Sequence, residues 1–266
     1  MITETAIDEW QKFAPWALKN QIEQDLIISR ALIEIFNNDY LKDKIAFRGG
    51  TALNKLIFPK PLRYSEDIDL NRLEKGPAKI VIDEMRNSLN EMLGQPKKVL
   101  STHRSIKVIY HYQSRDGGTS KLKVEINVCE TLPQKNLNPI PYEMSSIYFQ
   151  GRTTVMAFNT EEMIGSKIRA LYQRSKGRDL FDLYESRNLS INWDQVVSSF
   201  QKLNVCTSAK ELEKNVELKM KDAEFLKDII PLLPIGVAYN ADDAYQWFIQ
   251  ELVLRFKKIS KKIVSK

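Results

Sequence analysis

The feature that most limits the possible folds of this chain is a change of hydrophobic pattern near residue 158. Before it, short strand-like runs alternate with helical stretches, whereas almost every later segment repeats its apolar residues at helical spacing. The pattern predicts an α+β chain, with a mixed sheet and flanking helices over residues 1–158 and an all-helical lobe over residues 159–266. With 266 residues in total, each part has an ordinary domain size.

The same patterns place individual elements. In the first part we expect helices over residues 20–36 and 78–93, strands over 45–47 and 68–73, and hairpin strands over 105–112 and 121–128. The turn sequence RDGG at 115–118 favours that hairpin. The Pro- and Asn-rich stretch 133–142 is interpreted as a loop. In the second part helices are expected over 159–173, 177–184, 194–203, 223–233 and 241–263.

The cysteine count, the first residues and the length of the apolar runs exclude several classes of protein. The two cysteines, Cys129 and Cys206, cannot form a zinc site or a disulfide framework; they are either free thiols or a single bridge. The first residues, MITETAIDEW, lack the basic and apolar regions of a signal peptide. No apolar run approaches the roughly 20 residues that span a bilayer. We therefore expect a cytoplasmic protein that does not contact a membrane.

Positive charge gathers at the end of the chain. The formal net charge is +6, and residues 251–266 carry six Lys or Arg against one Glu, a net +5. This end is either the solvated end of a helix, where Lys suits the macrodipole, or a contact for phosphate backbones.

A glycine pair follows the first expected strand. Gly49 and Gly50 precede Thr51 where a helix is expected to begin, and a tight turn with free N–H groups at such a place attracts phosphate. Any tight strand-to-helix turn also favours Gly-Gly, so the pair alone leaves its role open.

Two aspartates stand two positions apart on the next expected strand. Asp67 and Asp69 alternate with Ile68 and Leu70, so the carboxylates share one face while the apolar side chains pack on the other. Two like charges this close raise the free energy unless a cation neutralises them, and Mg²⁺ commonly takes one or two carboxylates together with phosphates. The pattern favours a metal site.

Glu125, on the second strand of the hairpin, is a candidate third metal ligand. It shares a strand face with Lys121 and Lys123, so it is equally consistent with a solvent-facing edge residue.

Four segments resemble a known family. FRGGTALNK at 47–55 and RYSEDID at 63–69, followed by EEMIGSKIRAL at 161–171 and RSKGRDLFDL at 174–183, resemble in order the four motifs of the AbiEii/AbiGii nucleotidyltransferase toxins. This family includes the MenT-type enzymes and is similar to the polymerase-beta nucleotidyltransferase superfamily. The resemblance covers about half the chain, from residue 47 to residue 184.

The resemblance implies roles for individual residues. It implies that a nucleotidyltransferase domain over 1–158 binds two Mg²⁺ ions and a nucleoside triphosphate (NTP), and that the helical lobe completes the active-site cleft. The implied catalytic residues are Asp67, Asp69, Lys167 and Asp179; the nucleotide-binding residues are Gly49, Gly50, Thr51, Lys55, Arg63 and Ser65; the metal ligands are Asp67, Asp69 and Glu125.

Two of these roles have a structural alternative. Lys55 lies one helical turn after Thr51, so it either contacts the triphosphate or forms a surface salt bridge. Asp179 and Asp182 share a helix face and could pair with nearby arginines; Asp182 is interpreted as structural support.

The function implied is that of a toxin in a toxin–antitoxin pair. Such an enzyme transfers a nucleoside monophosphate from NTP to RNA, with the tRNA 3′ end favoured, and releases pyrophosphate; an antitoxin encoded nearby is the expected partner. The alternatives are transfer to a protein or small-molecule hydroxyl, or an inactive nucleotide-binding module. The intact aspartate pair and glycine turn argue against the inactive module, and no G-x-x-x-x-G-K-[ST] loop supports a kinase.

Overall fold

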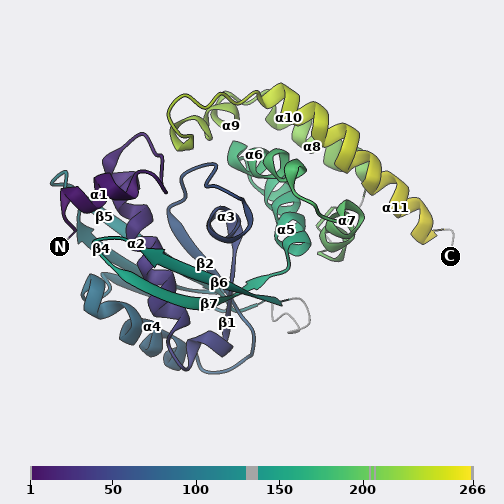
Figure 1. Ribbon diagram of the computed structural model, residues 1–266. Helices are drawn as coiled ribbons and strands as arrows, with labels where there is room; N and C mark the ends of the chain where they lie inside the picture. Colours follow the sequence, from purple (N-terminus) through teal and green to yellow (C-terminus); the bar gives the residue numbers. More distant parts are fainter. Residues whose placement is uncertain (1, 130–136, 204, 207, 265–266) are drawn as a thin grey trace. The chain divides into compact units, whose positions relative to one another are not determined.

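The computed structural model describes residues 2–129, 137–203, 205–206 and 208–264. The chain folds into two compact units, Met1–Phe158 and Asn159–Lys266 (Figure 1). The first unit is a mixed sheet with helices and the second is helical, so the α+β fold class expected from the sequence is confirmed.

Among the described residues, seven strands form one sheet in the order β3-β4-β5-β2-β1-β7-β6. The strands are β1 (Ile45–Arg48), β2 (Asp67–Arg72), β3 (Lys98–Ser101), β4 (Ser105–Gln113), β5 (Thr119–Asn127), β6 (Leu137–Ser145) and β7 (Gln150–Phe158). β4 and β5 form the predicted antiparallel hairpin.

The pairing of β2 decides which polar residues meet. β2 runs antiparallel to β1 and parallel to β5. In this register Asp69 lies between Arg48 of β1 and Glu125 of β5, and Asp67 lies opposite Lys123 of β5. The charged residues of three strands therefore share one face of the sheet, because directly opposed residues point to the same side.

The opposite face of the sheet is apolar. Ile68 and Leu70 of β2 and Val124 and Ile126 of β5 are fully or almost fully buried, and they alternate with the charged positions. Helices α2 (Lys19–Phe36) and α4 (Ala78–Leu93) pack against each other and against the sheet, and α1 (Glu4–Trp10) packs on α2 (Figure 1). The burial of this apolar face holds the charged face outward.

The sequence interpretation was wrong about residues 137–142. They begin β6, which pairs with β7, whereas residues 133–136 lie outside the described part of the chain. Pro139 and Pro141 are compatible with this strand because β6 is at the edge of the sheet, where a missing N–H costs no ladder hydrogen bond. Strands β3 and β7, helix α1 and the helix Ala209–Lys219 (α8) were also not individually predicted.

The second unit consists of helices, as predicted. They are α5 (Thr160–Gln173), α6 (Gly177–Glu185), α7 (Trp193–Lys202), α8 (Ala209–Lys219), α9 (Ala223–Lys227), α10 (Ala241–Trp247) and α11 (Leu254–Val264). The Asn159 side chain caps α5 by accepting the Glu161 N–H at 2.9 Å.

Two of the expected helices differ in detail. The helix expected over 223–233 ends at Lys227 and is followed by a 3₁₀ turn, Ile230–Leu232, because Pro231 and Pro234 cannot donate to a continuing helix. A π-helical stretch, Phe248–Val253, joins α10 to α11. No helix within the described residues is long and apolar enough to cross a bilayer.

Candidate active site

The glycine turn comes into direct contact with one of the paired aspartates. Gly49 follows β1, begins α3 (Gly49–Ala52) and has a φ of +83°. A Cβ atom added to Gly49 would lie 2.7 Å from Asp69 Oδ2 and 3.1 Å from Asp69 Cβ. Only glycine allows both this φ and this approach, so the structure brings together the two features that the sequence singled out separately.

Asp67 and Asp69 share the half-exposed face of β2, as the alternation predicted. Burial raises the pKa of the Asp69 carboxyl, and the nearby Asp67 carboxylate raises it further; Arg48 and Lys123 oppose this rise. The pair is thus a place where negative charge costs free energy and a cation is favoured.

Lysines contact these acids directly. The Lys123 Nζ atom lies 2.8 Å from Asp67 Oδ2 and 3.4 Å from Glu125 Oε2. The Lys107 Nζ atom lies 3.0 Å from Glu125 Oε1. Burial raises the pKa of Glu125, but Lys107 and Lys123 outweigh burial and hold that pKa below its ordinary value. The sequence placed Lys123 beside Glu125 but did not predict its ion pair with Asp67.

Glu125 is therefore beside the aspartates but is held by two ammonium groups. In the part of the chain that the structure describes, no group of three or more His, Cys, Asp or Glu side chains is arranged to hold a metal ion. The role of Glu125 as a third metal ligand stays a prediction.

Thr51 and Ser65 connect the helix start to the aspartate strand. Their hydroxyl oxygens are 2.6 Å apart, and the Thr51 hydroxyl donates to the Asp67 carbonyl at 2.5 Å. Thr51 is buried. Both hydroxyls thus help to fix the first residue of β2 beside the glycine turn. The phosphate contacts predicted for Thr51 and Ser65 stay predictions.

Lys55 points into a buried cluster on α2. Its Nζ atom lies 2.6 Å from Asp25 Oδ1 and 2.8 Å from Ser29 Oγ. The Trp10 Nε1–H donates to the same Asp25 oxygen at 2.8 Å. Of the two interpretations of Lys55, the structure shows the salt bridge, although it is buried instead of lying at the surface.

Arg63 is buried, and its Nη1 donates to the Tyr64 carbonyl at 3.0 Å. The backbone of this segment is held by Asn54, which the sequence analysis missed. Asn54 Oδ1 accepts the N–H groups of Leu62 at 3.0 Å and of Arg63 at 3.3 Å, and its Nδ2 donates to the Gly50 carbonyl at 2.9 Å. Asn54 thus ties the loop before β2 to the glycine turn.

Gln24 is a second residue that the sequence analysis missed. Its Nε2 donates to the Glu66 carbonyl at 3.0 Å and to the Lys121 carbonyl at 2.9 Å, and its Oε1 accepts from the Tyr112 hydroxyl. Glu66 precedes Asp67, and Lys121 lies two residues before Lys123, so Gln24 anchors α2 to both strands that carry the charged face. In the sequence, Gln24 stands between Glu23 and Asp25 on the predicted helix, and nothing local marks it as buried.

Lys167 lies in the second unit, in a buried cluster of charges. Its Nζ atom is 3.2 Å from Asp179 Oδ1 and 2.6 Å from Asp182 Oδ2. Arg174 binds Asp179 through two hydrogen bonds, of 2.7 Å from Nε and 2.8 Å from Nη2. Both aspartates are completely buried. Asp182 is thus a closer partner of Lys167 than Asp179 is.

The charges of this cluster compensate for its burial. Burial raises the pKa of Asp179, but Lys167 and Arg174 outweigh burial and lower the pKa to about 2. Asp179 is therefore ionised at neutral pH, and it holds two cations within the helical unit.

The comparison with protein families shows to which family the chain belongs. The family model described as nucleotidyl transferase AbiEii toxin, type IV toxin–antitoxin system, matches residues 30–250. The chain belongs to the AbiEii family. It is accordingly a nucleotidyltransferase toxin of a toxin–antitoxin system, as the resemblance implied, and an antitoxin is its expected partner.

Two solved structures have a fold similar to that of this chain. JHP933 from Helicobacter pylori is 18% identical, with a TM-score of 0.59 over 93% of this chain and 97% of its own. MenT4, a nucleotidyltransferase toxin from Mycobacterium tuberculosis, is 16% identical, with a TM-score of 0.59 over 96% of this chain and 89% of its own. Among curated proteins, none matches this sequence.

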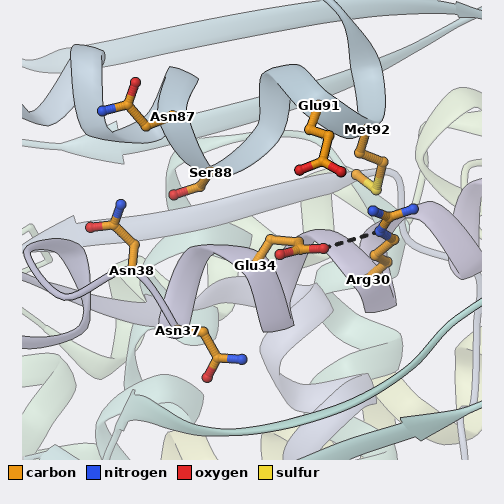
Figure 2. A pocket seen from close by; sticks show the side chains of 8 residues that line it. All are labelled: Arg30, Glu34, Asn37, Asn38, Asn87, Ser88, Glu91 and Met92. Atoms are coloured by element: carbon orange, nitrogen blue, oxygen red, sulfur yellow. Dashed lines mark hydrogen bonds and ion pairs between the residues drawn. The ribbon is translucent and has the colours of Figure 1, made fainter.

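A cavity elsewhere in the AbiEii fold is distinct from the charged face. About 230 Å³ of space lies between the ends of α2 and α4, where Arg30 pairs with Glu34 at 3.1 Å (Figure 2). Asn87, Ser88 and Glu91 of α4 line its other side. None of the residues that line this cavity is one of the predicted site residues.

Proposed function

We propose that this AbiEii toxin is a Mg²⁺-dependent enzyme that transfers a nucleoside monophosphate from NTP to RNA, with the 3′ end of tRNA as the favoured acceptor. The observation that carries the proposal is the close approach of Gly49 to Asp69, where a Cβ added to Gly49 would lie only 2.7 Å from Asp69 Oδ2. It places a turn suited to phosphate next to carboxylates suited to a divalent cation.

Asp67 and Asp69 are the proposed metal ligands. They fit Mg²⁺ because they offer oxygen donors on one face, beside a turn where phosphates can supply the remaining oxygens. A bound divalent cation would neutralise charge on the phosphates and on the attacking and leaving oxygens. The Thr51 side chain supports the pair, because its hydroxyl donates a hydrogen bond to the Asp67 backbone carbonyl.

Gly49 and Gly50 are the proposed phosphate contacts. They begin a helix whose N-cap residue, Arg48, provides no side-chain capping bond, so the first N–H groups of the helix are suited to bind an anion. Thr51, Ser65 and Arg63 support this turn through the hydrogen bonds described above. Lys55 is left outside the proposed phosphate site because its ammonium pairs with Asp25.

The reaction balances without any further reagent. An acceptor hydroxyl oxygen bonds to the α-phosphorus, the bond from that phosphorus to the oxygen bridging to the β-phosphate breaks, and pyrophosphate leaves. The hydroxyl proton passes to a carboxylate of the charged face or to water. A direct catalytic role of Lys167 and Asp179, and the completion of the site by residues 159–266, stay predictions from the family resemblance.

The basic end of the chain supports RNA as the acceptor. On α11, Lys257 and Lys258 are exposed, whereas Leu252, Val253 and Phe256 of the same helical run are buried. A helix that buries one face and presents lysines on the other is suited to bind a phosphate backbone.

The test is a labelling reaction with purified protein. We expect Mg²⁺, total tRNA and one of the four α-³²P-labelled NTPs to give labelled tRNA, and we expect Asp67→Ala and Asp69→Ala each to abolish it. Glu66→Ala is the matched control, because Glu66 is an exposed acid directly before the pair. Labelling that persists in both aspartate variants contradicts the metal assignment. A second reaction uses cell lysate in place of tRNA. Label that protease removes and nuclease does not remove contradicts RNA as the acceptor.

A further inference from the structure

Lys123 has a position that the proposed reaction does not explain. It lies directly opposite Asp67 in the parallel pairing of β2 and β5, and its ammonium lies between two carboxylates, 2.8 Å from Asp67 Oδ2 and 3.4 Å from Glu125 Oε2. Only 27% of its side chain is exposed. An ammonium group thus occupies the position at which a cation bridging these two acids would be expected.

The charges directly around the three acids, leaving aside the exposed Lys121 on the same strand face, balance without any ion. Asp67, Asp69 and Glu125 carry three negative charges, and Lys107, Lys123 and the adjacent Arg48 carry three positive charges. A divalent cation that binds Asp67 must compete with the Lys123 ammonium and remain close to it. Because like charges repel strongly at a partly buried site, this competition weakens the binding of a free cation.

A triphosphate changes this balance. Its phosphates add several negative charges next to the same face, and these give both the cation and the ammonium a further partner. The cation and the nucleotide should then bind much more tightly together than either does alone, which is a coupling between two sites.

We propose that Lys123 is a positioning residue that couples metal binding to nucleotide binding in this enzyme. It holds Asp67 and Glu125 by ion pairs, disfavours a free divalent cation, and favours the cation that arrives with a triphosphate. The inference rests on the proposed function, because it takes Asp67 as a metal ligand and the nucleotide as the substrate.

The experiment measures Mn²⁺ binding to the full chain by the electron paramagnetic resonance signal of free Mn²⁺. Mn²⁺ is titrated into the protein first without nucleotide and then with the α,β-methylene analogue of each of the four NTPs in turn. The readout is the coupling ratio, which is the Mn²⁺ affinity with nucleotide divided by the affinity without it. We expect Lys123→Met to tighten binding of free Mn²⁺ about tenfold and to lower the coupling ratio at least tenfold.

Two variants serve as controls. Lys121→Met removes the same charge from an exposed position two residues earlier on the same strand face, and it should leave the coupling ratio as in the wild type. Lys123→Arg keeps the charge and should retain most of the coupling. Lys123→Gln replaces Lys123→Met if a thermal melt shows that the Met variant does not fold.

The coupling ratio and the two affinities decide between the possible roles of Lys123. A coupling ratio unchanged by the neutral variants overturns the inference, and so does an equal weakening of both affinities, which would make Lys123 only a support for the acids. An Asp67→Ala/Asp69→Ala variant must lose Mn²⁺ binding in the presence of nucleotide. If that variant binds as the wild type does, the proposed metal site itself fails, and the role of Lys123 fails with it.

Discussion

Replacement of Gly49 by alanine tests the contact on which the site depends. The new Cβ would lie 2.7 Å from Asp69 Oδ2 and 3.3 Å from Asp69 Cγ. Two costs add. An L-residue at the left-handed φ of +83° costs about 1–2 kcal/mol, and the displacement of a packed neighbour costs about 1–3 kcal/mol more. We therefore expect the free energy of unfolding to fall by about 2–5 kcal/mol.

Gly117 provides a matched control for the first cost. Its φ is +86°, but a Cβ added there would meet nothing within 4 Å. Gly117→Ala should then lower the free energy of unfolding only by the cost of the left-handed backbone conformation, about 1–2 kcal/mol. The difference between the two variants, measured by equilibrium urea unfolding, isolates the contact of Gly49 with Asp69.

A double-mutant cycle identifies the partner. Asp69→Ala removes the carboxylate that the new Cβ would touch, so Gly49→Ala should cost about 1 kcal/mol less in that background than in the wild type. In the single variant Gly49→Ala, tRNA labelling should fall about a hundredfold, because a shift of about 1 Å in a catalytic group has effects of this size. Equal costs at Gly49 and Gly117, together with no coupling to Asp69, would refute the reasoning.

Two further predictions concern the helical unit. The Asp179 carboxylate, whose pKa is lowered to about 2 from 3.8, contributes about 2 kcal/mol of stability that is present above about pH 4 and is lost as the pH falls towards 2. Asp179→Asn should remove this part of the acid transition in chemical-denaturation curves, and an unchanged pH profile would contradict the assignment. Lys257→Glu with Lys258→Glu should weaken tRNA binding and flatten its dependence on salt in filter-binding assays. The same charge change at Lys210 and Lys214 is the control, and an equal loss there would show that only net charge matters.

Local sequence patterns predicted the parts of the site that depend on a single segment. The shared face of Asp67 and Asp69 follows from strand alternation, and the close backbone at Gly49 follows from the need for a tight turn. The hairpin of β4 and β5 follows from the turn residues Asp116 and Gly117. Each of these inferences needs only a few consecutive residues.

The parts that could not be predicted depend on distant segments. The ion pair of Lys123 with Asp67 requires that β5 lies parallel beside β2, and no local signal gives that neighbour. The pairing of Lys55 with Asp25 likewise joins two helical segments 30 residues apart. Strand β6 was missed for the opposite reason: its prolines indicate a loop locally, and only its place at the sheet edge makes them compatible with a strand.

The charged face around Asp67 and the buried cluster around Asp179 differ in what a substitution can reveal. The Asp67 side chain is 33% exposed and lies on a strand whose opposite face, with Ile68 and Leu70, is buried, so its loss leaves the packing of the sheet intact. Asp179 is completely buried between two cations, and its removal leaves Lys167 with one partner fewer in the interior, at a cost of about 3–5 kcal/mol. Loss of labelling in an Asp67 variant is therefore direct information about chemistry. The same loss in an Asp179 variant is information about chemistry only if the unfolding free energy shows that the helical unit is still folded.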